Sequence, residues 1–419
     1  MKIEWNKYLL KEVPQNAVRH VFHETKERYE DLRSAYYLKK NSEKKNDPNR
    51  QIRVAFIVQM SEIWDKEEPV YSAMKEDPRF SVTMIVVPPY DQVYQRIEAD
   101  YGNNFFLINY PEAIKAYQNG KWLKIDDEND YVFFQRPYDQ YLPKHLRSQA
   151  LVKLTKCCYI PYGYTGSDIF NEGSTDKTFF RNLYLGCAES AHMAQVFKKR
   201  YRVKEERTLH KICFCGFPAL TPYFNLKPTN EFRRILWTPR WSYAPKLGGS
   251  HFLEYKETII NLKKQSSGLE VTFRPHPLLF GEMISNALMS KQKIDIYLGQ
   301  LEQNGIVYDT GCPIYETLRN TDILITDYSS IIIQFFITGR PIVYCESDIV
   351  LNDDFNRLTE GMYVVRNEEE LISAVKSLSN GIDPLCMRRQ KIIAELLKEH
   401  EDATSRIIET VLKDYQDNC

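Results

Sequence analysis

The sequence predicts an α/β protein built from two doubly wound, Rossmann-type domains that face a cleft. Three observations predict this class. Short apolar runs rich in Val, Ile and Phe alternate with helical segments along most of the 419-residue chain. The alternation occurs twice, and each half has the size of an ordinary domain. A break at Gly216, Phe217 and Pro218 separates the halves and is typical of an interdomain linker.

The first half begins with a charged helical segment, predicted over 21–40, and a polar linker that ends near Arg50. The apolar run VAFIV then predicts the first buried strand, and the spacing that follows is that of βαβ units. We expect strands at 54–58, 82–87, 104–108, 131–135, 157–161 and 211–215, with helices at 70–76, 94–101 and 182–201.

The second half repeats the pattern, starting from the run ILWT. We expect strands at 235–238, 270–274, 306–309, 323–325, 342–344 and 362–365, with helices at 252–264, 280–289, 331–338, 368–378 and 387–415. The predicted organisation is an N-terminal helical appendage with its linker (1–50), two Rossmann-like domains (51–216 and 217–395) and a C-terminal helix (396–419).

Composition narrows the function classes. Lys plus Arg equals Asp plus Glu at 56 each, so charge gives no argument for a nucleic-acid partner. The nine Cys include no C-x-x-C pair, which favours small buried hydrophobic residues over a metal site, and we predict no cofactor. The N-terminus is not typical of a signal peptide, and no run reaches the ~18 apolar residues of a membrane span. We therefore predict a cytoplasmic protein whose only membrane contact is peripheral, at the inner face.

Polar side chains follow three predicted strands of the second half. Arg240 follows ILWT, Arg274 and His276 follow EVTF, and an acid with several hydroxyls follows DILI. That last loop contains Thr326, Asp327, Ser329 and Ser330, and an apolar helix follows it. The carboxyl ends of parallel strands open on one edge of a sheet, so these groups should share a site. Guanidinium groups, an imidazole and a helix N-terminus are suited to a diphosphate. Glu346, after the next strand, is a weaker candidate to face a ribose or polyol.

Taken in order, the segments TPRW, FRPHP and DILITDYSSIIIQFFITGRPIVYCE resemble the CDP-glycerol glycerophosphotransferase family, which builds teichoic-acid-type polymers and has relatives in capsule pathways. The resemblance covers about 211–365, and the N-terminal half resembles a less characterised branch. It implies a GT-B architecture, a CDP-linked polyol phosphate donor and a membrane-bound polymer acceptor. It also implies that Arg274 and His276 contact the transferred phosphate. The loop residues from Thr326 to Ser330 would bind the donor diphosphate and the polyol, with the nucleotide on the second domain and the acceptor on the first.

One departure concerns the acceptor side. Better-known members carry a His-Gly-Thr-Pro turn whose His is the proposed general base, whereas this chain has Tyr162 before Gly163. A free phenol titrates near ~10 and is a poor base at neutral pH. The group that takes the acceptor's proton is therefore left open.

The sequence is consistent with three functions. The leading hypothesis is transfer of a polyol phosphate from a CDP-linked donor to a hydroxyl of a cell-surface glycan or teichoic-acid-like polymer, which we expect to be lipid-linked. In it Arg274, His276 and Asp327 are catalytic, and Arg240, Thr326, Ser329, Ser330 and Glu346 bind the donor. The alternatives are a GT-B glycosyltransferase that uses a nucleotide sugar, and a catalytically silent binding subunit of a polysaccharide complex.

Overall fold

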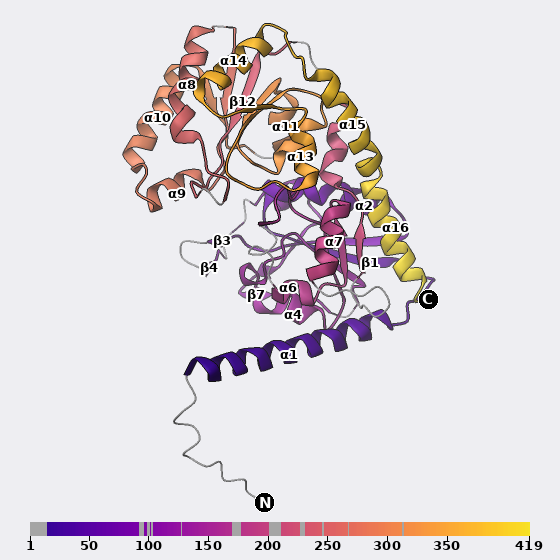
Figure 1. The fold of residues 1–419 in the computed structure, drawn as a ribbon. Coiled ribbons are helices and arrows are strands. Elements are labelled where there is room, and N and C mark those ends of the chain that lie inside the picture. The colour runs from indigo at the N-terminus through magenta and orange to yellow at the C-terminus, as the bar shows by residue number, and fades with distance from the viewer. Residues whose placement is uncertain are drawn as a thin grey trace, which may run out of the picture.

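The computed structural model describes residues 15–91, 96–98, 101, 104–126, 128–169, 177–200, 211–226, 231–244, 247–266, 268–311 and 314–419. Within this part of the chain, two parallel sheets form two α/β domains, one above the other in Figure 1. The predicted doubly wound architecture is present in both.

The N-terminal sheet has seven strands in the order β11-β10-β9-β8-β1-β2-β5, all paired in parallel. Its strands are β1 (Ile52–Val58), β2 (Phe80–Val86), β5 (Ile114–Lys115), β8 (Tyr131–Phe134), β9 (Lys156–Tyr159), β10 (Leu185–Ala188) and β11 (Lys211–Phe214). Two small antiparallel pairs, β3 (Tyr90–Asp91) with β4 (Arg96–Ile97) and β6 (Tyr117–Gln118) with β7 (Lys121–Trp122), lie outside it.

The C-terminal sheet has six parallel strands in the order β14-β13-β12-β15-β16-β17. They are β12 (Arg234–Thr238), β13 (Glu270–Phe273), β14 (Ile306–Tyr308), β15 (Ile323–Thr326), β16 (Ile342–Cys345) and β17 (Tyr363–Val365). Within each sheet the strands run 3-2-1-4-5-6 in their own sequence order, with one further strand in the N-terminal sheet. The order reverses between β1 and β8 and between β12 and β15. Such a switch point is where doubly wound folds bind ligands.

Helices connect the strands. In the N-terminal half they are α1 (Gln15–Ser42), η1 (Ser61–Lys66), α2 (Glu68–Glu76), α3 (Phe105–Asn109), η2 (Asp139–Tyr141), η3 (Lys144–Leu146), α4 (Ser148–Leu151), α6 (Lys177–Arg181) and α7 (Ala191–Arg200). In the C-terminal half they are η4 (Pro218–Tyr223), α8 (Phe252–Gln265), α9 (Leu279–Ser285), α10 (Lys291–Gln303), α11 (Ile314–Arg319), α12 (Ile331–Phe336), α13 (Asp353–Thr359), α14 (Glu368–Ser379), α15 (Cys386–His400) and α16 (Ala403–Gln416).

The last helix returns to the first domain. Figure 1 shows α15 and α16 in succession along one side of the molecule, from the upper domain to the lower one. Asp414 of α16 is buried and accepts hydrogen bonds from Tyr131 Oη (2.6 Å), Tyr184 Oη (2.7 Å) and Lys156 Nζ (2.7 Å). Because Lys156 matches its charge, this carboxylate is tolerated in the core and fixes α16 against the N-terminal sheet.

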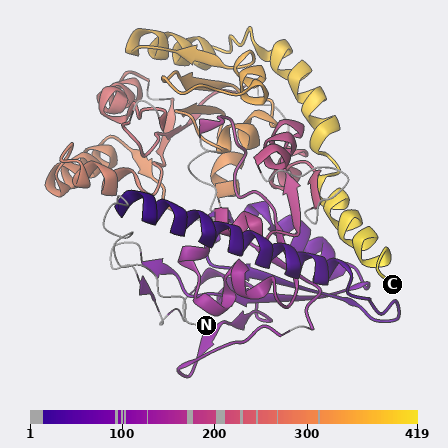
Figure 2. The same ribbon diagram turned by 60° about the horizontal axis from the view of Figure 1, so that its bottom comes forward.

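The N-terminal helix α1 lies across the helices of the first domain in Figure 2. Ser34 donates to Asn182 Oδ1 (2.7 Å), and Asn41 donates to the carbonyls of Val152 (2.7 Å) and Thr155 (2.8 Å). Within the part of the chain that the structure describes, no helix has both the length and the apolarity needed to span a bilayer.

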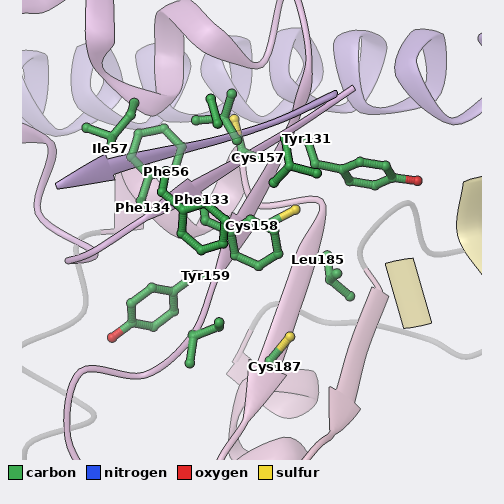
Figure 3. Close-up of a cluster of buried hydrophobic side chains, with 14 of the residues drawn as sticks. Phe56, Ile57, Tyr131, Phe133, Phe134, Cys157, Cys158, Tyr159, Leu185 and Cys187 are labelled. Carbon is green, nitrogen blue, oxygen red and sulfur yellow. The ribbon is translucent and has the colours of Figure 1, made fainter. Parts of the chain in front are cut away.

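The core of the N-terminal domain consists of apolar side chains from β1, β8, β9 and β10, and Figure 3 shows several of them. The rings of Phe56 and Phe133 stack with centroids 4.9 Å apart. Cys157, Cys158 and Cys187 are buried among these side chains as free thiols. Among the described residues, no three His, Cys, Asp or Glu side chains are grouped as metal ligands would be.

Four predictions of secondary structure were wrong or incomplete. The 104–108 run is a helix because the Asn104 side chain caps it, accepting from Phe106 N. The first part of 182–201 is the strand β10, whose small residues are buried on both faces. The segment 387–415 divides into α15 and α16, because each packs on a different domain. Helix α10 was missed. The helix predicted over 94–101 lies largely outside the described residues, and Arg96–Ile97 within it form β4.

Candidate functional site

Asp327 joins the two loops at the switch point of the C-terminal sheet. It follows β15, and its side chain is 2% exposed. Its Oδ2 accepts from the backbone N–H of Arg240, after β12, at 2.8 Å. Its Oδ1 lies 2.7 Å from Nδ1 of His251. These contacts use most of the carboxylate's acceptor capacity, so Asp327 acts here as a clasp between loops.

His251 is a partner that the sequence did not reveal. Its ring stacks on Tyr255 with centroids 5.4 Å apart. Burial acts to lower the pKa of His251, but the hydrogen bond and charge of Asp327 outweigh burial and the pKa is raised. The pair therefore favours the imidazolium form and a charge-assisted contact.

Arg240 holds the neighbouring loops with its guanidinium group. Its Nε donates to the Leu247 carbonyl at 2.6 Å, and its Nη1 donates to the Tyr328 carbonyl at 2.8 Å. The group lies over the rings of Trp241 and Tyr328, at 5.9 and 5.1 Å. Burial lowers the pKa of Arg240, although an arginine remains charged at neutral pH. Its positive charge thus stays at the switch point.

His276 is exposed at the carboxyl end of β13, beside Trp241 (centroids 6.2 Å apart). Its Nδ1 accepts from Leu278 N at 3.2 Å. Although part of the side chain reaches solvent, partial burial of the ring, and then the charge of Arg240, lower the pKa of His276 to about 4. The ring is consequently neutral at pH 7 with its proton on Nε2, because Nδ1 is an acceptor. That proton can be donated to an anionic oxygen.

Arg274, the other residue of the RPHP segment, is held within its own domain. Its Nη1 donates to Asp309 Oδ2 at 2.7 Å and lies 3.3 Å from Thr317 Oγ1. Asp309 follows β14, so this ion pair connects the loops after β13 and β14. Burial acts to raise the pKa of Asp309, but hydrogen bonds from Thr317 and Arg274 outweigh burial, and the pKa is lowered.

The remaining predicted donor residues differ in their surroundings. Thr326 is fully buried, and its hydroxyl bonds to Thr238. Glu346 pairs with Arg366 at 2.5 Å, and its backbone carbonyl accepts a hydrogen bond from His251, the partner of Asp327. Ser329 Oγ accepts from Ile331 N at 3.4 Å, whereas Ser330 makes no side-chain cap for α12. Ser330 is the member of this group that lies against the N-terminal domain, next to Gly163.

The predicted donor and acceptor loops are in contact. A Cβ placed on Gly163 would lie 3.4 Å from Ser330 Cβ. The Tyr328 hydroxyl accepts from Gly166 N at 2.9 Å. Tyr162 bonds through its hydroxyl to the hydroxyl of Tyr138, at 2.8 Å. The structure therefore brings the acceptor-side residues against the serine loop.

The switch point of the N-terminal sheet has a clasp of its own, which sequence reasoning missed. Gln135, after β8, accepts through Oε1 from the backbone N–H groups of Gln59 (2.8 Å) and Met60 (2.7 Å), after β1. Its Nε2 donates to the Met60 carbonyl at 2.7 Å. Arg136 comes next and donates to Gln59 Oε1. The available signal was the run FFQRPY, in which a strand leads directly into polar residues.

A model of the family CDP-Glycerol:Poly(glycerophosphate) glycerophosphotransferase matches residues 164–413. The teichoic acid glycerol-phosphate primase of Bacillus subtilis (strain 168) is 25% identical over an alignment of 276 residues, and the match covers 60% of this chain. The chain spans 66% of the length of that relative.

Two solved structures show the fold. A UDP-N-acetylglucosamine 2-epimerase superposes with a TM-score of 0.57 at 12% identity, over 88% of this chain and 97% of that one. The wall teichoic acid polymerase TagF superposes with a TM-score of 0.52 at 16% identity, over 96% of this chain and 97% of that one. Both support the predicted GT-B-like fold. Because the family model covers more than half of the chain, the protein belongs to the CDP-glycerol:poly(glycerophosphate) glycerophosphotransferase family, as its sequence predicts, and is a transferase.

Proposed function

We propose that this protein transfers a polyol phosphate, glycerol phosphate in the first instance, from a CDP-linked donor to a hydroxyl of a teichoic-acid-like polymer. The observation that carries the proposal is the contact between the two loops at the domain junction. Gly163 of the acceptor-side loop packs on Ser330 of the serine loop, and Gly166 is bonded to Tyr328. A donor at one switch point and an acceptor at the other would therefore meet at this junction.

The reaction is a phosphoryl-type transfer. The acceptor hydroxyl attacks the phosphorus that bears the glycerol. A new P–O bond forms there as the bond to the bridging oxygen breaks, and CMP leaves with that oxygen while the hydroxyl proton is released. Such a reaction depends on positioning and on stabilising charge at the leaving phosphate. Arg240 supplies a fixed positive charge, and neutral His276 supplies a hydrogen-bond donor beside it.

Asp327 has a positioning role in this proposal. Its buried carboxylate holds Arg240 by the backbone and His251 by the ring, so it sets where the charge of Arg240 lies. Arg274 has a similar role through Asp309 unless the donor displaces that carboxylate. Ser330, next to Gly163, is placed to contact the transferred group.

A donor panel tests the proposal. Purified protein is mixed with CDP-glycerol, CDP-ribitol, UDP-sugars or CMP-sugars, and the unfolding temperature and the nucleotide released to a glycerol phosphate polymer are measured. We expect stabilisation and CMP release only with CDP-polyols. Turnover of a nucleotide sugar would favour the glycosyltransferase alternative, and no ligand at all would favour a binding subunit. Repeating the assay after dialysis against a chelator tests the prediction that no metal is required.

A further inference from the structure

The proposed function gives no role to the pocket at the N-terminal switch point. It lies at the carboxyl ends of β1 and β8 and is lined by Ile57, Gln59, Phe134, Gln135, Arg136, Tyr138 and Leu142. Polar and charged side chains thus share a hollow with apolar strand ends. In a doubly wound sheet this is the position expected for a ligand.

Arg136 is the charged group of this pocket. Its guanidinium donates to Gln59 Oε1 and lies 4.8 Å over the ring of Tyr141. Among the described residues, no carboxylate lies within ion-pair distance of it. Burial lowers its pKa, and tyrosines together with Glu62 oppose the shift. A guanidinium has five N–H donors, so most of its hydrogen-bonding capacity is available to a ligand.

Two hydroxyl groups continue from this cation toward the domain junction. The hydroxyls of Tyr138 and Tyr162 are 2.8 Å apart, and both tyrosines lie near enough to Arg136 to influence its pKa. Gly163, next along the chain, packs on Ser330. The sequence of contacts therefore runs from Arg136 through the two tyrosines to the serine loop.

We propose that Arg136, Tyr138 and Tyr162 form a subsite for a phosphate group of the acceptor. The inference rests on the proposed function, because a polyol phosphate polymer presents a phosphodiester next to the polyol whose hydroxyl attacks. A guanidinium fork matches the geometry of phosphate oxygens, and the hydrogen-bonded pair of tyrosine hydroxyls adds one further O–H donor. Binding that phosphate fixes the distance from the attacking hydroxyl to the donor, so the acceptor is oriented for transfer.

The experiment compares two acceptors that differ only in this group: a glycerol unit attached through a phosphodiester to a short alkyl chain, and the same unit attached through an ether. Wild type should prefer the phosphodiester. Arg136→Gln should raise the KM for the phosphodiester acceptor about 10- to 100-fold, the usual range for a lost hydrogen bond to a charged group. The KM for the ether and for CDP-glycerol should not change. Arg136→Lys should fall in between, because the charge remains and the fork is lost.

Arg79→Gln is the matched control, since Arg79 is exposed and precedes β2, at the opposite edge of the same sheet. If Arg136→Gln changed the KM for both acceptors equally, or if wild type showed no preference between them, the subsite would be overturned. Continued transfer from CDP-glycerol would show that the proposed function still stands. Absence of transfer in wild type would instead contradict the proposed function. In that case, calorimetric titration with glycerol 3-phosphate still tests the subsite. The subsite requires that wild type binds glycerol 3-phosphate and that Arg136→Gln binds it more weakly. Thermal unfolding of each variant checks that it folds.

Discussion

At both switch points, one side chain holds two neighbouring loops together, but the two side chains differ in charge. In each sheet the residue after the fourth strand in sequence accepts backbone N–H groups from the loop after the first. In the C-terminal domain that residue is Asp327, with His251 at 2.7 Å. In the N-terminal domain it is Gln135, an uncharged amide with its own donor to Met60. A basic side chain lies beside each clasp, Arg240 in one case and Arg136 in the other.

The difference shows how charge is distributed at the site. The charged clasp brings a carboxylate next to the loop of Arg240, which already bonds to two carbonyls. The neutral clasp fixes the backbone without supplying a counter-charge, so the charge of Arg136 is not neutralised by its clasp. Under the two proposals above, the C-terminal switch point would hold the diphosphate of the donor. The N-terminal switch point, which has the same strand order, would hold a single phosphate of the acceptor.

Exchanging charge between the clasps gives the largest expected effect. Asp327→Asn should destabilise the fold by about 3 kcal/mol, since an amide nitrogen cannot accept from the groups that now donate to the carboxylate. Transfer should fall more than about 100-fold as Arg240 shifts. Denaturant unfolding and kcat/KM measure the two effects.

Gln135→Glu is the matched exchange in the other clasp. The new carboxylate still accepts from Gln59 and Met60 N–H groups and loses only the donation to the Met60 carbonyl. We expect a cost of about 1 kcal/mol, the net value of an ordinary hydrogen bond. If both exchanges cost the same, the distinction between a charged and a neutral clasp fails.

His276→Ala addresses the ligand side of the C-terminal switch point. Transfer should fall about 100-fold, the usual cost of removing one donor to a developing charge. Stability should change little, because the ring is exposed. Because the pKa of His276 is lowered to about 4, the ring stays neutral through the pH range in which a free histidine titrates. Wild-type activity should therefore show no limb from this residue between pH 6.5 and 8. A limb there that disappears in His276→Gln would contradict the assignment of a neutral donor.

Much of this site could be predicted from the sequence, and the limits have a physical cause. Strand ends followed by Arg240, His276 and Asp327 were visible as local patterns. His251 was missed because no strand precedes it, and only folding brings it to Asp327, 76 residues away. The role of Gln135 also depends on a partner loop 76 residues away. Local patterns determine which side chains follow strands, whereas the pairing of loops depends on the order of strands in the sheet.

The junction between the switch points can be tested with two glycines of one loop. A Cβ on Gly166 would lie 2.3 Å from Phe355 Cδ2 and 2.9 Å from Tyr328 Cε2, whereas a Cβ on Gly163 meets Ser330 at an ordinary 3.4 Å. Gly166→Ala should cost about 3 kcal/mol by overpacking and should lower transfer by moving Tyr328. Gly163→Ala should cost little stability. Equal unfolding temperatures for the two variants would show that the domains do not pack closely through this loop.

A further contrast with Asp327 concerns Glu189, a buried carboxyl of the N-terminal domain beneath the same loop. One of its oxygens accepts from Thr165 N at 3.1 Å, and the other has no hydrogen-bond partner. Burial raises the pKa of Glu189 to about 7. Unlike Asp327, it faces no histidine or arginine among the groups that shift its pKa.

The sign of the pH effect follows from this raised pKa. Below about pH 4 the carboxyl is protonated in both the folded and the unfolded chain and has no effect on stability. As the pH rises toward 7, the unfolded chain loses the proton first, so the free energy of unfolding falls. Glu189→Gln cannot ionise and should gain on the order of 2 kcal/mol relative to wild type between pH 5 and pH 8, with no change above that. Denaturant titrations of both proteins at the two pH values measure this gain. A gain that is the same at both would mean that the carboxyl ionises normally in the fold, and the contrast with Asp327 would then lie only in the neighbours of the two groups.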